Sequence, residues 1–380
     1  MKVALLGYGT VGRGVYDMLR TCPLFEAGPV LVRPGKTDEP FKLSSLDAIL
    51  SDESVDAVAE VMGGIEPAFS YCAAALKAGK HVVTSNKALV AEKGIELNKL
   101  ARENGVGFLF SAACGGAVPF LHNLELARQS DEIISLGGIL NGTTNFMLDK
   151  MQSEGTEYAD VLKEAQALGY AEADPTADVT GLDALRKIML GCAVAYDMLP
   201  TDGLLNEGID SLKASDAAHF QAKGLTCRLL ANGGIADGKL YAYVQPALLK
   251  GDAPECAVRQ NYNMAKYIGK NSGRIVLMGQ GAGRYPTASA VIRDLECLLF
   301  GQREMLHAEC RAVSADNSGC VCAYYVRLPR EFASRLDFES LEDCGDAVRG
   351  ITKPMSVRAM HEAACAMRAE GVELFFAEIV

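Results

Sequence analysis

The sequence has 380 residues, of which 49% are hydrophobic and 22% are charged, a balance typical of globular proteins. A chain of this length can form two or three domains, each with its own hydrophobic core. Its 37 basic and 48 acidic side chains give a net charge of -11, which argues against nucleic acid or an anionic membrane surface as the default partner.

The N-terminal segment has no pattern of targeting or membrane insertion. The first apolar run, 3–6, has the length of a strand and is too short for the core of a signal peptide. No stretch approaches the roughly 18 to 20 apolar residues that a bilayer-spanning helix needs. We therefore expect a cytoplasmic protein whose partner is a small molecule.

The first hundred residues predict a parallel sheet covered by helices, because short apolar runs alternate with helical stretches. Gly79 and Gly105 stand where two of the helices should end. The predicted strands are 2–6, 30–32, 57–61, 81–84 and 107–110, and the predicted helices are 11–20, 67–78 and 91–103.

Beyond about residue 125 the pattern is that of an α+β fold. The predicted elements are a strand at 133–140, a polar turn at 141–145, helices at 158–168 and 181–196, and strands at 240–245 and 274–278. A strand at 321–327, a helix at 356–370 and a strand at 372–379 follow. We expect an α/β domain at 1–128, completed by about 280–305, an α+β domain at 129–280, and a small tail at 306–380.

Gly7, Gly9 and Gly12 form a G-x-G-x-x-G motif between the first predicted strand and the first predicted helix. In this context the glycines allow a tight turn, close approach of backbone to a pyrophosphate, and packing of the helix on the strand. The helix N-terminus, with Thr10 and Val11, would present N–H groups to the phosphates. The motif therefore indicates a dinucleotide site, and a purely structural glycine turn is the alternative.

The end of the second predicted strand bears on which dinucleotide binds. NAD-binding folds ordinarily place Asp or Glu there, where it holds the ribose 2′-hydroxyl. Here Val32 is followed by Arg33, and no acidic residue comes before Asp38. Arg33, helped by Lys36, suits the 2′-phosphate of NADP, although a solvated basic loop is the alternative. We favour NADP over NAD.

A loop rich in carboxylates leads into the predicted helix 181–196. Within that helix Asp183 and Lys187 are four residues apart, so they share a face. Such a pair on its own is usually a surface salt bridge. Because an acidic loop precedes this pair and an apolar stretch, 188–190, follows it, a buried polar site is also indicated.

Five blocks, in chain order over residues 1–305, resemble the homoserine dehydrogenase family. They are the glycine motif 7–12, GKHVVTSNKAL at 79–89, GILNGTTNF at 138–146, the carboxylate-rich block 169–187, and the segment 279–291. The first block alone would say little, whereas five with this spacing are specific. The resemblance implies a Rossmann-type NAD(P)-binding domain, an α+β domain for substrate binding and dimerisation, and a homodimer or homotetramer.

The resemblance also implies interconversion of L-homoserine and L-aspartate 4-semialdehyde, in threonine and methionine biosynthesis. The aldehyde oxygen becomes an alkoxide as hydride arrives, so a proton donor and a positive charge are needed nearby. Lys187 matches the family's catalytic lysine and would be the general acid or base. Lys87 matches a second lysine and, just past a strand end, is expected at the cofactor crevice, where it would orient the substrate or share the proton transfer.

Other site residues follow from the same resemblance. Glu172 and Asp183 occupy the positions that bind the substrate ammonium, and Gly281 belongs to the segment that returns to the cofactor domain. The remaining matches are to the pocket wall, namely Tyr170, Gly142 and Thr143. Asp174 and Asp178 remain open between loop architecture and substrate contact.

Two segments depart from the family pattern. Ser111 stands where the family has a glutamate of a monovalent-cation site; backbone oxygens of Cys114, Gly116 and Val118 could still surround an ion, but the lost charge argues against sodium. The tail resembles a reduced ACT-like module in which 330–334 replaces the usual glycine-containing ligand turn. We expect it to help subunits associate, and feedback binding of an amino acid stays open.

Two alternatives to this function remain at the level of sequence. One is a related dehydrogenase of another small amino or oxo acid, and the other is a non-catalytic nicotinamide-binding sensor. The joint presence of Lys87, Glu172, Asp183 and Lys187 argues against the sensor, because binding alone gives no chemical reason to keep all four.

Overall fold

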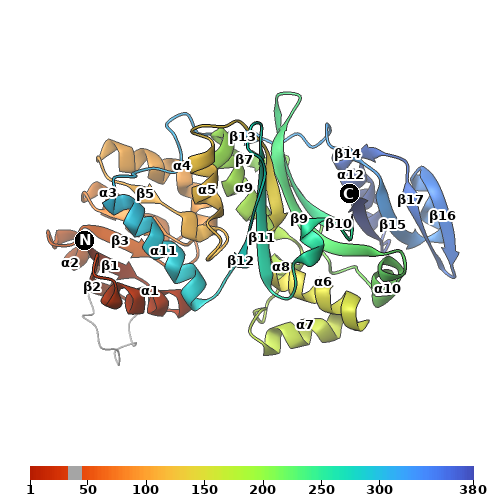
Figure 1. Ribbon diagram of the computed structural model, residues 1–380, viewed down its shortest axis with the longest axis horizontal. Coiled ribbons are helices and arrows are strands. Elements are labelled where there is room, and N and C mark those ends of the chain that lie inside the picture. Colours follow the sequence, from red (N-terminus) through yellow and green to blue (C-terminus); the bar gives the residue numbers. More distant parts are fainter. Residues whose placement is uncertain (33–44) are drawn as a thin grey trace. The chain divides into compact units, whose positions relative to one another are not determined.

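The computed structural model describes residues 1–32 and 45–380 (Figure 1). Arg33 and Lys36, predicted to face the 2′-phosphate of NADP, lie outside the described residues. The chain forms two compact units. The first comprises Met1–Ile133, Leu190–Leu199 and Leu277–Ala312, and the second comprises Ile134–Met189, Pro200–Val276 and Val313–Val380.

The first unit is built on a parallel sheet whose order, among the described residues, is β2-β1-β3-β4-β5. Buried apolar residues predominate in its strands, as expected of a parallel sheet with both faces covered. The strands are β1 (Lys2–Leu6), β2 (Glu26–Leu31), β3 (Ala57–Glu60), β4 (His81–Thr84) and β5 (Phe108–Leu109). The predicted Rossmann-type fold is thus confirmed.

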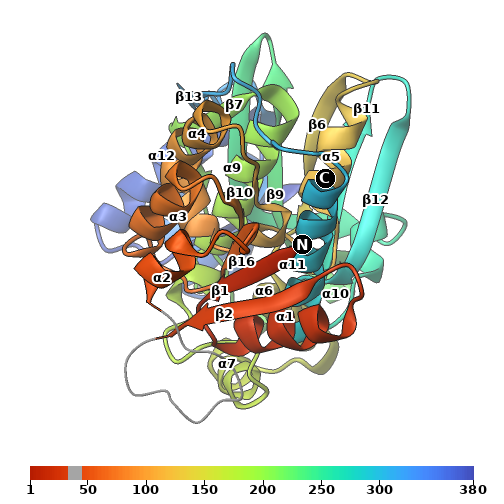
Figure 2. The same cartoon turned by 90° about the vertical axis from the view of Figure 1, so that its left-hand side faces the viewer.

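Helices cover both faces of this sheet. Figure 2 shows α1 and α11 on one side and α2, α3 and α4 on the other, and the contacts of α1 with α11 and of α3 with α4 agree. The helices of this unit are α1 (Thr10–Thr21), α2 (Leu46–Ser51), α3 (Ala68–Lys77), α4 (Lys87–Glu103), η1 (Ser111–Ala113), α5 (Phe120–Ala127) and α11 (Arg284–Leu299).

Two predicted boundaries in this unit were wrong. The second strand begins at Glu26 and ends at Leu31, earlier than the predicted 30–32. Helix α4 begins at Lys87, four residues before the predicted start, because the Asn86 side chain accepts a hydrogen bond from Leu89 N at 3.2 Å and caps the helix.

The second unit contains a long mixed sheet. Its order within the described residues is β12-β11-β6-β9-β10-β19-β15-β17-β16, with β8 also paired to β10. The strands that precede the tail are β6 (Ile133–Ile139), β8 (Leu205–Asn206), β9 (Leu225–Ala236), β10 (Lys239–Lys250), β11 (Tyr262–Gly269) and β12 (Gly273–Gln280). The strand predicted at 240–245 is thus part of a much longer strand.

Helices of this unit carry the candidate site. They are α6 (Gly142–Glu154), α7 (Tyr158–Ala167), α8 (Thr176–Val179), α9 (Leu182–Tyr196), α10 (Ala214–Ala222) and α12 (Val357–Ala369), with the 3-10 turns η2 (Pro254–Ala257) and η3 (Arg330–Arg335). Helix α9 continues into the first unit. Two short strand pairs complete the fold, β7 (Met198–Asp202) with β13 (Arg311–Ser314), and β14 (Val321–Cys322) with β18 (Met355–Ser356).

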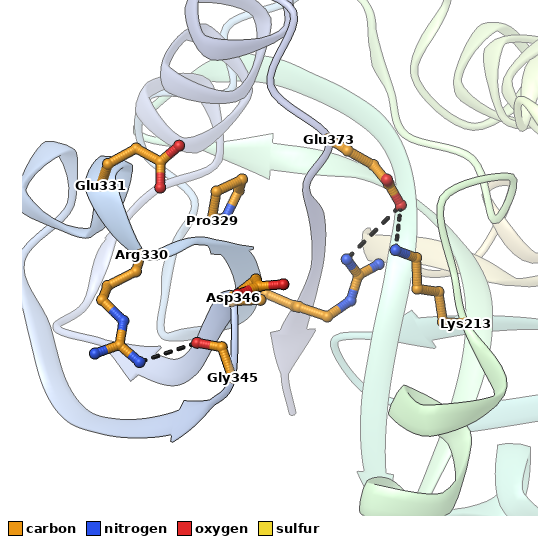
Figure 3. Close-up of a pocket in the computed structure, with 9 residues that line it drawn as sticks. Lys213, Pro329, Arg330, Glu331, Gly345, Asp346 and Glu373 are labelled. Atoms are coloured by element: carbon orange, nitrogen blue, oxygen red, sulfur yellow. Dashed lines mark hydrogen bonds and ion pairs between the residues drawn. The ribbon is translucent and has the colours of Figure 1, made fainter.

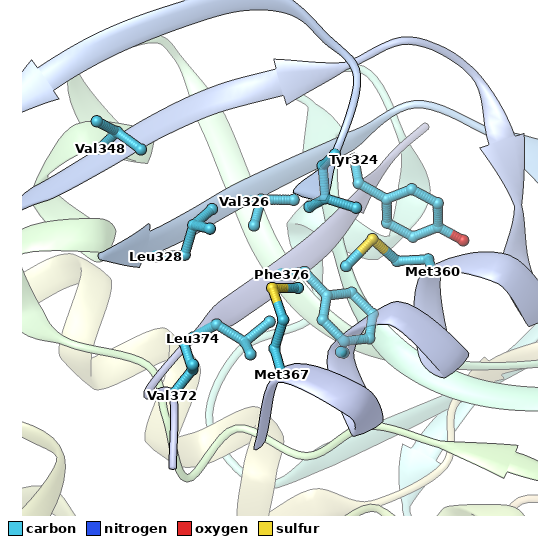
Figure 4. Packing of buried hydrophobic residues seen from close by; sticks show 11 residues of the cluster. Tyr324, Val326, Leu328, Val348, Met360, Met367, Val372, Leu374 and Phe376 are labelled. Atoms are coloured by element: carbon cyan, nitrogen blue, oxygen red, sulfur yellow. The ribbon is translucent and has the colours of Figure 1, made fainter. Parts of the chain in front are cut away.

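The tail adds four strands to the end of this sheet. They are β15 (Tyr324–Pro329), β16 (Phe338–Cys344), β17 (Ala347–Thr352) and β19 (Phe375–Ile379), in the order β19-β15-β17-β16. The chain order is that of a split β-α-β fold in which the 3-10 turn η3 replaces the first helix. Tyr324 and Val326 of β15 pack against Met360 and Met367 of α12 (Figure 4).

The tail is joined to the rest of the second unit through its last strand. β19 pairs in parallel with β10, so that Ala247 lies beside Glu378 and Leu248 beside Ile379. The tail sheet therefore continues the sheet that carries α6. None of the helices in 1–32 and 45–380 is long and apolar enough to cross a membrane.

Candidate active site

The glycine motif connects β1 to α1, and its three glycines meet three different demands. Gly7 has a φ of +105°, which favours glycine, and a Cβ on Gly12 would lie 2.4 Å from Gly7 O. Around Gly9, by contrast, nothing lies within 4 Å of a Cβ. Gly7 thus makes the turn, Gly12 lets the helix pack on it, and Gly9 leaves space for a ligand to reach the backbone.

This loop fits a dinucleotide pyrophosphate. Helix geometry leaves the N–H groups of the first turn, which includes Thr10 and Val11, without acceptors inside the helix. Such a helix end attracts anions. The open space at Gly9 is the observation that supports the fit, because any side chain there would occupy it.

A buried carboxyl group that we did not predict lies at the carboxyl edge of the same sheet. Glu60, the last residue of β3, accepts hydrogen bonds from Met62 N at 2.7 Å and Thr84 Oγ1 at 2.5 Å. Its burial raises its pKa. The sequence signal was an acidic residue in an otherwise apolar strand. Through Thr84, Glu60 fixes the strand end just before Asn86 and Lys87.

Lys87 lies where the sequence placed it. It is the first residue of α4, directly after the Asn86 cap, and follows the carboxyl end of β4. In parallel α/β sheets this edge is where ligands bind. Lys87 and the glycine loop therefore lie at the same edge of the sheet of the first unit.

The second unit contains the other predicted lysine in a buried ion pair. Lys187 Nζ lies 2.7 Å from Asp183 Oδ2, one helical turn earlier in α9, and donates to Leu140 O at 2.6 Å. The Lys187 and Asp183 side chains are only 8% and 13% exposed. The pair is thus the buried polar site and not a surface salt bridge.

Asn141 links this pair to a second carboxylate. Its Nδ2 donates to Asp178 Oδ1 at 2.7 Å and to Asp183 Oδ2 at 2.9 Å. Its Oδ1 accepts from Thr144 N at 2.8 Å and caps α6. The predicted polar turn at 141–145 was therefore wrong, because an asparagine cap starts a helix there. A role for Asn141 itself was not predicted from the sequence.

The charges of this cluster are unequal. Two carboxylates, Asp178 and Asp183, lie beside one ammonium, that of Lys187. Burial raises the pKa of Asp178, the charge of Asp183 raises it further, and Asn141 and Lys187 lower it. Carboxylates at this position are suited to bind an ammonium group.

The predicted pocket-wall residues gather at the first turn of α6. Thr143 Oγ1 donates to Tyr170 O at 2.6 Å, and the Tyr170 ring packs edge-on against Phe146, with centroids 5.1 Å apart. A Cβ on Gly142 would lie 2.5 Å from Asn261 O, so the backbone is tightly packed there. Gly142, Thr143 and Tyr170 are therefore brought together, next to the Asn141 cap.

Glu172 and Asp174 lie on the exposed loop between α7 and α8. Asp174 Oδ1 accepts from Thr176 N at 3.1 Å, which supports the start of α8. Hydrogen bonds from the side chain and then the backbone of Thr176 lower the pKa of Asp174. This contact with Thr176 supports the architectural role of Asp174, and the alternative of a substrate contact stays untested. Gln166 Nε2 donates to Glu172 O at 3.1 Å, which fixes the backbone of Glu172. The predicted contact of the Glu172 carboxylate with substrate stays a prediction.

Comparisons with known proteins agree on one family. The family model described as homoserine dehydrogenase, NAD binding domain, matches residues 7–111, and the model described as homoserine dehydrogenase matches residues 119–295. A homoserine dehydrogenase of Corynebacterium glutamicum is 42% identical over 313 residues, which are 77% of this chain and 70% of the relative. The chain belongs to the homoserine dehydrogenase family.

Solved structures of the family show the same fold. A homoserine dehydrogenase from Thiobacillus denitrificans has a TM-score of 0.88 and 29% identity, and the match covers 100% of this chain and 98% of that one. A hyperthermophilic archaeal homoserine dehydrogenase in complex with NADPH has a TM-score of 0.68 and 26% identity, covering 79% and 98%. The chain is an NAD(P)-dependent oxidoreductase of this family.

The segment 111–118, which the family resemblance links to a cation site, is held by hydrogen bonds within the first unit. Ser111 Oγ donates a hydrogen bond to Asp294 Oδ1, and Ala112 N donates to Asp294 Oδ2 at 3.3 Å. Asp294, on α11, is buried, and burial raises its pKa to about 7. Val118 O, one of the three predicted ion ligands, accepts from Phe120 N at 2.8 Å.

These residues do not fit the cation site that the family resemblance implies. Position 111 supplies no charge, and the carboxylate beside it already accepts two hydrogen bonds from the same segment. Gly116 packs backbone to backbone on Gly281, since a Cβ on Gly116 would lie 2.6 Å from the Gly281 carbonyl carbon. Within the described part of the chain, no group of three or more His, Cys, Asp or Glu side chains could hold a metal ion.

The tail contains a cavity of about 550 Å³ lined mostly by charged side chains (Figure 3). Opposite charges at its wall are paired, Lys213 Nζ with Glu373 Oε1 at 2.7 Å, and Arg330 donates to Gly345 O at 2.9 Å. The remaining lining residues are Arg327, Pro329, Glu331, Asp346 and Ala347. The cavity contains none of the predicted catalytic residues.

Proposed function

We propose that this chain interconverts L-homoserine and L-aspartate 4-semialdehyde with NAD(P), and that Lys187 transfers the proton. The observation that carries the proposal is the buried Lys187–Asp183 pair, which Leu140 O and Asn141 hold where β6 leads into α6. The family to which the chain belongs supports the same substrate.

The chemistry explains why a buried lysine is needed. The nicotinamide, when bound, supplies or accepts the hydride. During reduction the aldehyde oxygen gains negative charge, which a neighbouring ammonium stabilises and then neutralises with a proton. We assign both tasks to Lys187, and in the reverse direction it accepts the hydroxyl proton. Leu140 O and Asp183, at 2.6 and 2.7 Å, fix the direction of its Nζ.

The substrate ammonium is proposed to bind at the carboxylates of this cluster. Asn141 donates to both Asp178 and Asp183 and thereby holds the two carboxylates together, where they can accept hydrogen bonds from an ammonium group. We propose Asp183 and Asp178 as the inner ligands and Glu172, on the exposed loop, as a further ligand. Gly142, Thr143 and Tyr170 form the wall beside them.

The cofactor is proposed to bind the first unit through the glycine loop, with Thr10 and Val11 facing the pyrophosphate. Lys87 is proposed to contact the nicotinamide nucleotide or to share the proton transfer. NADP is the proposed preference, because no acidic residue follows β2 before Asp38. The archaeal relative solved as an NADPH complex supports this preference. The family resemblance also leads us to propose a homodimer or homotetramer.

We further propose that turnover needs no monovalent cation. The hydrogen bonds of Ser111 and Ala112 to Asp294 hold the segment that an ion would otherwise organise. A glutamate at position 111 would bring a second carboxylate to a buried one, and a cation would then relieve their repulsion. Serine at this position removes that need.

One assay tests these proposals together. Purified protein, L-homoserine and either NADP or NAD are mixed, and the absorbance of the reduced cofactor is followed in sodium, potassium or choline chloride at equal ionic strength. We expect turnover of homoserine, a higher kcat/KM with NADP, and equal rates in the three salts. Turnover of another hydroxy amino acid in place of homoserine would contradict the function, and a rate that depends on sodium or potassium would contradict the cation proposal.

A further inference from the structure

The connection between α8 and α9 carries Asp178 on one side and Asp183 on the other, and a second backbone segment lies directly against it. Ile209 N donates to Val179 O at 2.8 Å, and Asn206 Nδ2 donates to Thr180 O at 2.8 Å. A Cβ on Gly208 would lie 2.2 Å from Val179 O, so only glycine allows this approach. Movement of residues 206–209 would therefore move the α8–α9 connection.

The tail holds this second segment through an ion pair between a partly exposed arginine and a buried carboxylate. Arg368, in the last turn of α12, donates from Nη1 to Glu207 Oε2 at 2.8 Å and from Nη2 to Glu207 Oε1 at 2.5 Å. The Glu207 side chain is only 4% exposed. Burial raises the pKa of Glu207, and the Arg368 guanidinium counteracts this effect. Two parallel charged hydrogen bonds fix both position and orientation.

A second tail arginine holds the other end of the segment that runs from β8 to α10. Arg327, on β15, contacts Asp216 Oδ1 and Oδ2 from Nε, both at 3.0 Å, and donates from Nη2 to Ser211 O at 2.7 Å. Asp216 in turn accepts from Lys213 N at 3.0 Å at the start of α10. Glu373 of the tail pairs with Lys213 at the same place (Figure 3).

We propose that Arg368 and Arg327 are positioning residues of the active site, through which the tail sets the spacing of Asp178, Asp183 and the start of α9. This inference rests on the proposed role of Asp178 and Asp183 in binding substrate. Loss of Arg368 leaves a buried carboxylate without its partner, which drives Glu207 toward solvent and pulls 207–209 away from Val179. The distance between the two carboxylates then changes.

We expect loss of Arg368 to weaken the binding of homoserine and to leave the binding of the nucleotide unchanged. Asp178 and Asp183 belong to the second unit, whereas the glycine loop belongs to the first. We expect Arg368→Ala to lower kcat/KM for L-homoserine by about tenfold to a hundredfold, mainly through KM, since displacements of about 1 Å have effects of this size. Arg368→Lys keeps the charge but not the paired hydrogen bonds, so its kcat/KM should lie between those of wild type and Arg368→Ala.

The experiment compares wild type, Arg368→Ala, Arg368→Lys and Arg335→Ala. The control Arg335 forms an exposed ion pair with Glu370 in the same tail, so its loss should leave both constants within about twofold of wild type. Steady-state kinetics with homoserine is paired with fluorescence titration of NADPH. Turnover by wild type tests the proposed function, and only the ratio of variant to wild type tests the positioning role.

Hydrogen exchange provides a readout that is independent of turnover. In Arg368→Ala, or in Arg368→Lys if the alanine variant does not fold, we expect faster exchange in peptides covering 176–183 and unchanged exchange in peptides covering 7–21. An unchanged KM for homoserine together with unchanged exchange at 176–183 would overturn the proposal. Equal acceleration of exchange in both peptides would overturn it as well, because that result indicates a general loss of stability.

Discussion

At the scale of single residues, the central feature is an asparagine shared by two acids. Asn141 Oδ1 is committed to the N-terminus of α6, so its Nδ2 points away from the helix, toward Asp178 and Asp183. The helix cap thus ensures that the two carboxylates contact the Nδ2 of Asn141 and not its Oδ1. The i,i+4 spacing of Asp183 and Lys187 was visible in the sequence, whereas the Asn141 contacts span 37 and 42 residues and depend on the tertiary fold.

Replacement of Asn141 tests this role through the pH dependence of activity. Burial and Asp183 already raise the pKa of Asp178, and the Asn141 hydrogen bond lowers it, so Asn141→Ala should raise it further. Because the proposed binding of the substrate ammonium needs ionised carboxylates, the acidic limb of the kcat/KM profile should move to higher pH. Asn104→Ala, a change at the exposed end of α4, is the control. A lower KM with an unmoved acidic limb would contradict the role of Asn141.

At the scale of elements, two glycines of the β1–α1 turn have different functions, one in packing and one in leaving space for a ligand. Gly12 is needed for packing, since a side chain there would meet Gly7 O, whereas Gly9 has an ordinary φ of -81° and open space around it. The motif predicts a different role for each glycine, and the space around Gly9 and Gly12 agrees with that prediction. Their difference follows from which of them faces the rest of the protein.

Alanine substitutions should therefore have opposite consequences at the two positions. Gly9→Ala should keep the wild-type melting temperature and weaken NADPH binding at least about tenfold, because the methyl group occupies the space for the pyrophosphate. Gly12→Ala should lower the melting temperature, because its Cβ meets backbone at 2.4 Å. Thermal melts and NADPH titration measure both effects. Unchanged NADPH affinity in Gly9→Ala would refute this assignment of the loop.

The paired strands β10 and β19 join the tail to the rest of the second unit, and we call this pairing the joint. It allows a second prediction at this scale. Glu378 of β19 is buried, accepts from Gln245 Nε2 of β10 at 2.7 Å, and has a pKa raised to about 7, chiefly by burial, with Lys266 lowering it. A raised carboxyl pKa gives stability that is complete below the unfolded value, near 4.5, and is lost as pH rises through about 7. Above that pH the joint contains a buried charge.

Glu378→Gln should therefore unfold like wild type at about pH 5 and be more stable by about 1 to 3 kcal/mol at about pH 8. Urea unfolding at the two pH values measures the difference. Glu362→Gln, at an exposed position of α12, should show no such dependence on pH. If Glu378→Gln is less stable than wild type at the higher pH, the joint needs the charge and this account of it is wrong.

At the scale of the whole molecule, the sequence predicted the parts whose signals are local. Strands β1 and β4, which contain the buried apolar residues 3–6 and 82–83, were placed correctly. Strand β9 was missed because Asn232, Gly233 and Gly234 interrupt its apolar pattern. The hairpin of β16 and β17 was missed because β16 is exposed along almost its full length and carries several charged residues.

No local sequence signal indicates the role of the tail. Arg368 and Glu207 are 161 residues apart, and nothing in either neighbourhood indicates the other. The sequence predicted a tail that helps subunits associate, a prediction that stands untested. The contacts within the chain give the tail a second task, since its arginines hold the backbone on which the α8–α9 connection rests.

The kinetics of Lys187→Ala test whether Lys187 transfers the proton. The variant is compared with wild type and with Lys163→Ala, which removes an exposed lysine of α7 in the same unit. We predict that kcat/KM for L-homoserine falls by at least about a hundredfold in Lys187→Ala, as expected for loss of a general acid–base group, with NADPH affinity unchanged and Lys163→Ala near wild type. Near-normal turnover by a folded Lys187→Ala protein would contradict the account.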